Sequence, residues 1–213
     1  MLAKKSLIEQ GFKTWIEIDK SAIKRNCDTF RKIVGSKVKL WSVVKSNAYG
    51  HGLSVFAKAV EKGVDGFCVD STVEGLRLRK EKIRKPILVL GPTFPARLGE
   101  GIANDIALTV SSFEALKPLL KSKNPPAFHL KIDTGMNRQG FFVEDLPKVL
   151  SMIKRSRSGA GSVLRGVYTH FASAKDINYP TYTERQFEKF QKAVRFFKRA
   201  GYKNLLLHAA ATG

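Results

Sequence analysis

The chain has 213 residues, of which 43% are hydrophobic, enough to bury a sizeable core in one or two domains. Its net charge is +20, but the 38 lysines and arginines are spread along the chain, which argues against nucleic-acid binding as the main role. The first ten residues contain no signal-peptide core, and no stretch approaches the roughly 18 apolar residues of a membrane span. Cys27 and Cys68 have no metal-ligand spacing. We therefore expect a cytoplasmic protein with free thiols, no metal, and no membrane or nucleic-acid partner.

The chain begins with an expected strand and helix. Trp15–Ile18 predicts a short N-terminal strand, at about residues 14–18. Asp19 or Ser21 is placed to cap the helix that follows. Four apolar residues of this helix recur at three- or four-residue steps and so share one face: Ile23, Cys27, Phe30 and Val34.

Seven apolar runs of strand length come next, separated by helix-like segments. One helix begins with the capping-box pattern Ser71-x-x-Glu74. Another begins with Thr183-x-x-Gln186 and stops at Gly201. The seven runs are Val38–Val44, Gly66–Val69, Ile87–Leu90, Ile106–Val110, Phe128–Ile132, Leu164–Thr169 and Asn204–Leu207.

The nearly continuous apolar character of these runs indicates strands that are buried on both faces, as in a parallel sheet covered by helices. Alternating strands and helices are typical of a doubly wound sheet or a (β/α)8 barrel of the TIM type. No glycine-rich dinucleotide fingerprint follows an early strand, so the barrel is favoured. A full barrel needs eight strands, and the sequence ends directly after the seventh. We expect residues 1–213 to form one incomplete α/β barrel domain.

In such a barrel the chemistry lies at the carboxyl ends of the strands. Lys45 follows the buried run Leu-Trp-Ser-Val-Val. Burial there favours a neutral amine, which can form a Schiff base with an aldehyde. A lysine at a strand end can equally extend its amine to solvent. Four polar segments follow strands and are expected to surround one pocket: 45–52, 131–140, 169–172 and 208–213.

The first of these segments carries a family resemblance. Val-Val-Lys-Ser-Asn-Ala-Tyr-Gly-His-Gly, residues 43–52, closely resembles the cofactor-attachment motif of alanine racemases and departs from it mainly at Ser46, where the family usually has alanine. Residues 131–140 are similar to the second signature of that family, and Thr169-His170-Phe171-Ala172 resembles the third. Order and spacing agree from about Trp15 to the last residue.

The resemblance implies specific roles for residues of these segments. Lys45 is implied to hold pyridoxal 5'-phosphate as an internal aldimine and to move the substrate α-proton on one face. Tyr49 is implied to contact the cofactor phosphate, and Arg138 to bind the substrate carboxylate. In the family the residue at Lys131 is often carbamylated, which gives an anion that orients this arginine. His170 is implied to lie near the cofactor ring.

Further positions are carried over from the same family. Thr212 and Gly213 are implied to bind the phosphate through a hydroxyl and backbone amides. Ala211 stands where the family frequently has asparagine, so that carboxamide contact is absent. Three more residues are interpreted as structural: His51, Asp133 and His208.

The implied activity is the interconversion of L- and D-alanine for cell-wall peptidoglycan by a homodimer. Racemisation needs a base on each face of the substrate, and in this family the second base is a tyrosine of a C-terminal β-domain that reaches the partner's site. That domain, the arginine that meets the cofactor's ring nitrogen, and the eighth strand are not found in the sequence. We expect an N-terminal portion of a racemase with little or no activity alone.

Two other readings use the same barrel and lysine. A single-domain pyridoxal-phosphate carrier fits the length of the chain, but the segments 49–52 and 136–138 resemble the racemase instead. A decarboxylase of basic amino acids shares the barrel but not this run of motifs. The substrate, alanine or another small amino acid such as serine, stays open.

Overall fold

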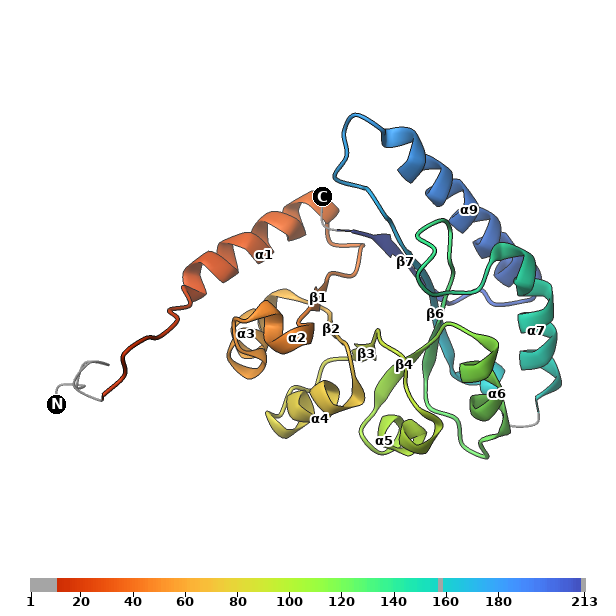
Figure 1. The fold of residues 1–213 in the computed structure, drawn as a ribbon, viewed down its shortest axis with the longest axis horizontal. Coiled ribbons are helices and arrows are strands. Elements are labelled where there is room, and N and C mark those ends of the chain that lie inside the picture. Colours follow the sequence, from red (N-terminus) through yellow and green to blue (C-terminus); the bar gives the residue numbers. More distant parts are fainter. Residues whose placement is uncertain (1–10, 157–158, 212–213) are drawn as a thin grey trace.

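The computed structural model describes residues 11–156 and 159–211, which contain a seven-stranded parallel sheet (Figure 1). The strands pair in sequence order from the first to the seventh, so β1 and β7 are the two edges of the sheet. The strands are β1 (Trp41–Val43), β2 (Gly66–Val69), β3 (Ile87–Val89), β4 (Ile106–Val110), β5 (Phe128–Lys131), β6 (Leu164–His170) and β7 (Leu206–Ala210).

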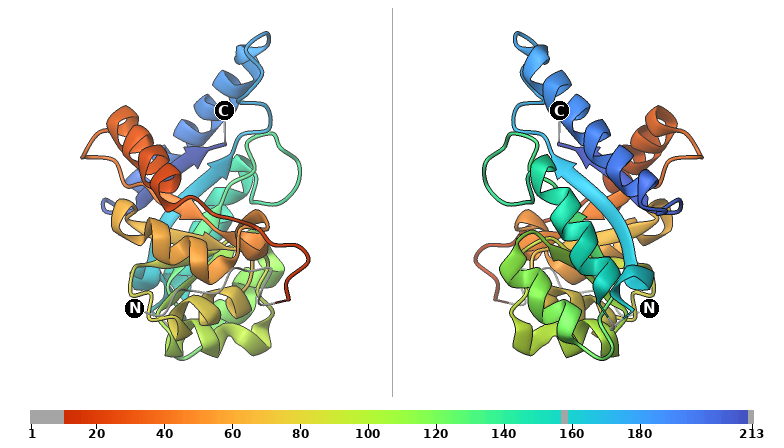
Figure 2. Two further views of the ribbon diagram at one scale, coloured as in Figure 1. Left: turned by 90° about the vertical axis from the view of Figure 1, so that its left-hand side faces the viewer. Right: turned by 90° about the vertical axis from the view of Figure 1, so that its right-hand side faces the viewer.

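Helices connect successive strands and lie around the outside of the sheet (Figure 2). Sequential parallel strands with helical crossovers are the arrangement of a TIM-type barrel, which confirms the expected fold class. The helices are α1 (Lys20–Val34), α2 (Lys45–Tyr49), α3 (Leu53–Val60), α4 (Thr72–Lys80), α5 (Leu98–Ala103), α6 (Phe113–Lys121), α7 (Leu146–Arg155), α8 (Ala160–Val163) and α9 (Pro180–Arg199). No helix within the described ranges is long and apolar enough to cross a membrane.

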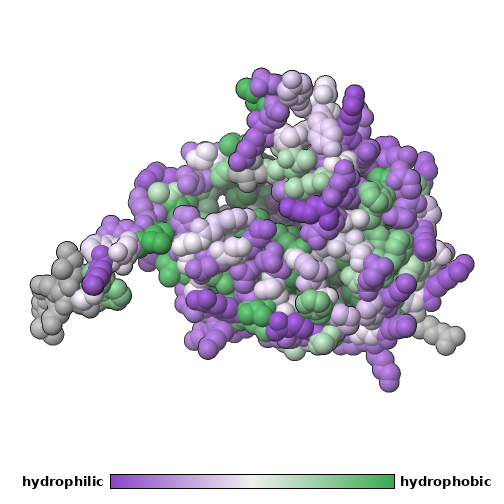
Figure 3. Space-filling model, viewed as in Figure 1, coloured by the Kyte–Doolittle hydropathy of each residue, from purple (hydrophilic) through white to green (hydrophobic). Residues whose placement is uncertain are grey.

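The core is divided between the two halves of the sheet. Phe67, Leu78 and Ile106 belong to a buried cluster between β1–β4 and the helices outside them. Phe128 and Phe197 belong to a second cluster, between β4–β7 and α6–α9. Full burial of one such side chain contributes roughly 1.5–3 kcal/mol. In the space-filling view the molecule is hollowed between its α1 side and its α9 side, with hydrophobic side chains beside the hollow (Figure 3).

Several expected helix starts are confirmed. Asp19 is the N-cap of α1, and its carboxylate accepts a hydrogen bond from the Ser21 amide at 2.7 Å. Ser71 is the N-cap of α4 and accepts from the Glu74 amide at 3.4 Å. The Glu74 carboxylate does not complete the capping box on Ser71, because it binds the Asp70 amide at 2.8 Å instead.

The expected strand at 14–18 is wrong. Trp15–Ile18 is irregular, and Ile16 is 74% exposed, because no neighbouring strand offers hydrogen bonds to this segment. Phe30 is also exposed, so the apolar face of α1 is only partly covered. Cys68 is a buried free thiol as expected, whereas Cys27 is only partly buried.

Two boundaries near the C-terminus differ from expectation. The last helix begins at Pro180 rather than at Thr183, since proline already has the backbone φ that the first helical position needs. The last strand is Leu206–Ala210, shifted from the expected 204–207. Its extent follows its pairing with β6, which joins Gly166 to Leu206 and His170 to Ala210.

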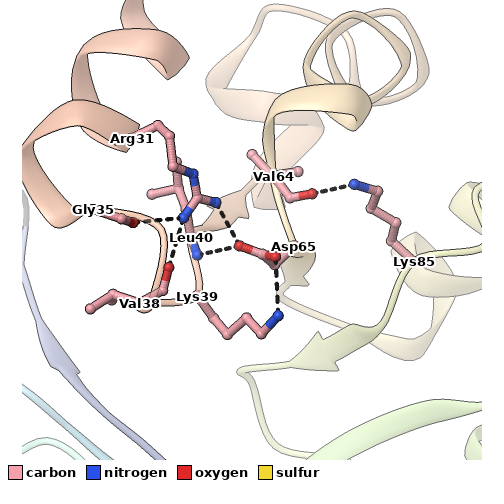
Figure 4. A network of polar contacts seen from close by, with 8 residues as sticks. All are labelled: Arg31, Gly35, Val38, Lys39, Leu40, Val64, Asp65 and Lys85. Carbon is pink, nitrogen blue, oxygen red and sulfur yellow. Dashed lines mark hydrogen bonds and ion pairs between the residues drawn. The ribbon is translucent and has the colours of Figure 1, made fainter.

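A polar network joins α1 to the amino ends of β1 and β2 (Figure 4). The Arg31 guanidinium donates to the carbonyls of Gly35 and Val38 and binds the Asp65 carboxylate at 2.6 Å. Asp65 also accepts from the Leu40 amide at 2.8 Å, and this hydrogen bond is the main reason that the pKa of Asp65 is lowered. The network fixes the approach of the chain to the first strand.

A layer of polar rings lies inside the sheet. His129 Nδ1 is 2.9 Å from His208 Nε2, and the His208 ring stacks on Tyr168 with centroids 4.6 Å apart. The Tyr168 hydroxyl lies 3.0 Å from the Thr109 hydroxyl. Burial lowers the pKa of His129 to about 3 and that of His208 to about 4. His208 is therefore a structural histidine within β7, as interpreted from the sequence.

The connection after β5 is a tight loop pinned back onto the sheet. Ile132 forms a bridge with Phe141, and the Phe141 amide donates to the Lys131 carbonyl at 2.9 Å. Gly140 has a φ of +134°, and a Cβ there would lie 2.5 Å from the backbone nitrogen of Asp133. Only glycine fits this close approach.

The buried histidine pair makes stability depend on pH. The unfolded histidines titrate near 6.5, so below this pH the unfolded chain takes up protons that the folded chain, with its lowered pKa values, does not. Stability should fall as the pH drops from 6.5 to 5, by up to about 1.4 kcal/mol per pH unit for each histidine. Urea unfolding at several pH values measures this slope. A double variant, His129→Gln with His208→Gln, should flatten it, and an unchanged slope would contradict the assignment.

The glycine of the β5 loop predicts a strong substitution effect. Gly140→Ala should lower the free energy of unfolding by about 3 kcal/mol, since backbone strain adds to a steric clash. Gly99→Ala is the matched control, because Gly99 lies in α5 with open space around it. The control should be neutral or raise stability by about 0.5–1 kcal/mol. Equal effects of the two substitutions in urea unfolding would refute the proposed constraint.

Candidate active site

The carboxyl ends of all seven strands meet at one edge of the sheet, because neighbouring strands are parallel. Lys45 follows β1 and Asp70 follows β2 at this edge. Lys131 is the last residue of β5, and His170 is the last residue of β6. Three residues predicted from the sequence, Lys45, Lys131 and His170, therefore lie at one end of the sheet, together with Asp70.

Lys45 lies at the mouth of the barrel, the end where the carboxyl ends of the strands meet, rather than within the core. Val44 before it is fully buried, whereas the Lys45 side chain is 33% exposed. The amine lies 4.0 Å from the Asp70 carboxylate. The sequence predicted a buried amine at Lys45, but the buried lysine is Lys131. Lys45 has an accessible amine with a negatively charged carboxylate beside it.

The chain turns in a left-handed helical sense directly after Lys45. Ser46, Asn47, Ala48 and Tyr49 have φ values of 54°, 56°, 54° and 54°. Left-handed backbone costs roughly 1–2 kcal/mol for each residue that carries a Cβ. Such strain persists only where surrounding contacts hold it, and it concentrates at functional sites.

Hydrogen bonds from several directions hold this turn. The Asn47 carbonyl accepts from the amides of Gly50 and Gly52, at 3.2 and 2.9 Å. The Asn47 side-chain oxygen accepts from the Leu53 amide at 2.9 Å, at the start of α3. His51 places Nδ1 2.9 Å from the Ala48 carbonyl. His51 therefore has the structural role expected of it.

Lys131 is a buried amine, only 4% exposed. Burial lowers the pKa of Lys131 to about 8, and the positive charges of Arg138 and Lys45 act in the same direction. Its amine lies 5.6 Å from the centroid of the Tyr168 ring. The lowered pKa raises the neutral fraction of the Lys131 amine, and a neutral amine is the form that reacts with electrophiles.

Asp133 shapes the loop that carries Arg138. Its carboxylate accepts hydrogen bonds from the Gly135 amide at 2.9 Å and the Asn137 amide at 3.1 Å. These bonds support the positive φ of Asn137, 54°, and place Arg138 on an exposed bend. No hydrogen bond or ion pair links the Arg138 guanidinium to any other described residue, so its donors are available to a ligand.

His170 ends β6 beside a buried glutamine of α9. The Gln186 amide group spans the ends of two strands, donating to the His170 carbonyl and the Thr134 hydroxyl at 3.4 Å each. Its oxygen accepts from the Ala172 amide at 2.9 Å. Tyr182, one turn earlier, donates to the Gly135 carbonyl at 2.6 Å. The start of α9 thus ties the β5 and β6 loops together.

Of the three residues expected to contact a phosphate, Tyr49 is the one within the described part of the chain. Tyr49 is 61% exposed, at the end of the left-handed turn, so its hydroxyl is accessible. Thr212 and Gly213 lie outside the described residues. Ala211 directly follows β7, on the same edge of the sheet as Lys45.

Asp70, whose carboxylate lies 4.0 Å from the Lys45 amine, was missed from the sequence. So were two further residues that shape the site. Gln186 is 1% exposed and Glu74 is half-buried, and both reach loops distant in sequence. Their helix-start patterns were recognised, but such patterns report only local capping. A buried polar side chain needs hydrogen-bond partners, and here these include backbone amides of segments distant in the sequence.

The donor set at the mouth fits an anionic cofactor and a carboxylate substrate. Lys45, Lys131 and Arg138 bring three basic groups to one edge of the barrel. Asp133 is occupied by backbone amides, and Asp70 faces Lys45 at the limit of an ion pair. The excess positive charge, together with the exposed Arg138 guanidinium, is suited to phosphate and carboxylate groups.

Comparisons with known proteins identify the family of this chain. Residues 18–213 match the family described as "Alanine racemase, N-terminal domain". Alanine racemase 1 of Caldanaerobacter subterraneus is 38% identical over 202 residues, and alanine racemase 1 of Bacillus subtilis is 39% identical over 201. The matches cover 92% of this chain but only 51% and 50% of those proteins.

Solved structures give the same result. An alanine racemase of Clostridium difficile 630 superposes with a TM-score of 0.85 and 30% identity, covering 93% of this chain and 56% of that one. The alanine racemase of Bacillus anthracis with bound L-Ala-P superposes with a TM-score of 0.83 and 33% identity, covering 92% and 51%. The chain spans about half the length of the curated relatives it matches. Its fold, its strand-end residues and these similarities together show that the chain belongs to the alanine racemase family.

Proposed function

We propose that this chain is the cofactor-binding half of a racemase that interconverts L- and D-alanine. The observation that carries the proposal is that an accessible lysine, a buried lysine and an arginine with no hydrogen-bond or ion-pair partner among the described residues lie at one mouth. Pyridoxal phosphate, when bound, supplies an electron sink for the charge left after α-proton removal. Lys45 would hold it, with Tyr49, Thr212 and Gly213 at the phosphate and His170 near the ring.

The protein's own groups would divide the remaining tasks. The Lys45 amine would remove or return the substrate α-proton on one face, with the Asp70 carboxylate beside its cationic form. Arg138 would bind the substrate carboxylate through two parallel hydrogen bonds. Both roles require side chains that reach the mouth, and both side chains are exposed enough to do so.

Lys131 would serve as an anion after carbamylation. A carbamate forms when a neutral amine attacks carbon dioxide and a proton leaves to solvent, and the lowered pKa of Lys131 supports this step. The product would replace a positive charge beside Arg138 with a negative one, which would orient the guanidinium.

Racemisation needs a second base on the opposite face of the substrate. The relatives are about twice as long as this chain, so we propose that their additional half supplies that base. On this proposal the working enzyme is a homodimer, its D-alanine serves peptidoglycan synthesis, and residues 1–213 alone have little or no racemase activity.

Attachment of the cofactor to Lys45 is directly testable. The 213-residue chain mixed with pyridoxal phosphate should develop the visible absorbance of the lysine-linked cofactor, and borohydride reduction should fix it on the peptide that contains Lys45. Lys45→Ala should abolish the absorbance. Lys58→Ala is the matched control, since Lys58 pairs with Glu81 on the surface, and it should behave as the wild type. Labelling of another lysine, or none, would refute the proposal.

The role of Arg138 predicts a selective loss of substrate affinity. With the cofactor bound, Arg138→Ala should weaken L-alanine binding at least tenfold, about 1.4 kcal/mol, because the carboxylate loses its charged partner. Binding can be followed from the visible spectrum. Arg138→Lys should recover part of the affinity, and Arg165→Ala, which alters an exposed arginine of β6, should leave it unchanged. An unaltered affinity in Arg138→Ala would exclude this role.

A further inference from the structure

The carboxylate of Glu74 binds backbone amides of two segments, the turn that follows Lys45 and the end of β2. One oxygen accepts from the Asp70 amide at 2.8 Å, and the other accepts from the Asn47 amide at 3.3 Å. Asn47 lies two residues after Lys45, within the left-handed turn. Asp70 carries the carboxylate that lies 4.0 Å from the Lys45 amine.

Glu74 is itself held in place by the helix that carries it. Its amide donates to the Ser71 hydroxyl in the N-cap of α4, and Thr72 and Gly75 beside it are buried. The side chain therefore starts from a fixed helical position at the end of β2. A carboxylate suits this task because it has two acceptor oxygens and no donor, so it can receive two amides at once.

The left-handed turn supplies the reason that such a support is needed. Four consecutive residues with a Cβ occupy an unfavourable backbone region, and the turn does not gain the regular bonds of a longer helix. Asn47 makes more of the hydrogen bonds that hold the turn than its neighbours do. Within the described part of the chain, the Asn47 amide donates only to Glu74.

We propose that Glu74 is a positioning residue for Lys45. It fixes the turn after Lys45 and the strand end that presents Asp70, and so sets the direction and the charged surroundings of the Lys45 amine. The inference rests on the proposed function of Lys45 as the cofactor-bearing lysine, but the geometry that it explains exists without any cofactor.

The test uses the 213-residue chain without cofactor. In Glu74→Ala both acceptor oxygens are lost, so hydrogen exchange at the Asn47 and Asp70 amides should accelerate at least tenfold. Labelling of Lys45 by trinitrobenzenesulfonate, read by mass spectrometry, should change at least threefold relative to Lys131. Glu81→Ala is the matched control, because Glu81 follows the same helix and pairs with Lys58 on the surface; it should alter neither readout.

A general loss of folding is separated from a positioning role by a second variant. Glu74→Asp keeps the charge but is one methylene shorter, so it should hold one amide and lose the other, giving an intermediate change with an unaltered circular dichroism spectrum. Exchange and labelling equal to the wild type in both variants would overturn the proposal, as would uniform acceleration over α4 and β2 in both. Neither readout involves pyridoxal phosphate, so failure of cofactor attachment at Lys45 would be recognised separately in the Lys45→Ala experiment.

Discussion

The site depends on one constraint, the parallel pairing of seven strands in sequence order. Each strand begins at the same end of the sheet, so residues far apart in the chain leave it at one common edge. Lys45 and Lys131 are separated by four strands along the chain, yet the charge of one acts on the other. A register shift of one residue would turn these side chains to the opposite face of the sheet.

The two ends of the sheet use arginine differently. At the amino end, Arg31 binds two carbonyls and Asp65, and Arg79 binds the carbonyls of Ile83, Lys85, Asn104 and Asp105. The donors of these guanidinium groups bind other parts of the chain and so stabilise the fold. At the carboxyl end, Arg138 has no such partner among the described residues, which is what a ligand site requires. The separation of stability from chemistry is typical of barrels of this kind.

The mouth also stores local strain that the rest of the structure must offset. The left-handed turn after Lys45 and the close approach of Gly140 to Asp133 both place backbone in costly positions. The side chains of Asn47, within the turn, and of Glu74, from α4, hold the first. Backbone hydrogen bonds of Phe141 with Lys131 and Asp133 hold the second. Rigid support of this kind keeps a lysine and an arginine in fixed relative positions without burying both, which the proposed cofactor site requires.

The sequence alone determined the order of strands, the fold class and the strand-end residues, because burial on both faces leaves continuous apolar runs and the polar residues after them stand out. It also placed Asp19 and Ser71 as helix caps, since capping is local. The tertiary structure decided the rest. Trp15–Ile18 is no strand because it finds no partner, and β7 takes its limits from β6. The turn after Lys45, the burial of Lys131 and the reach of Glu74 and Gln186 depend on contacts between distant segments, which no local pattern encodes.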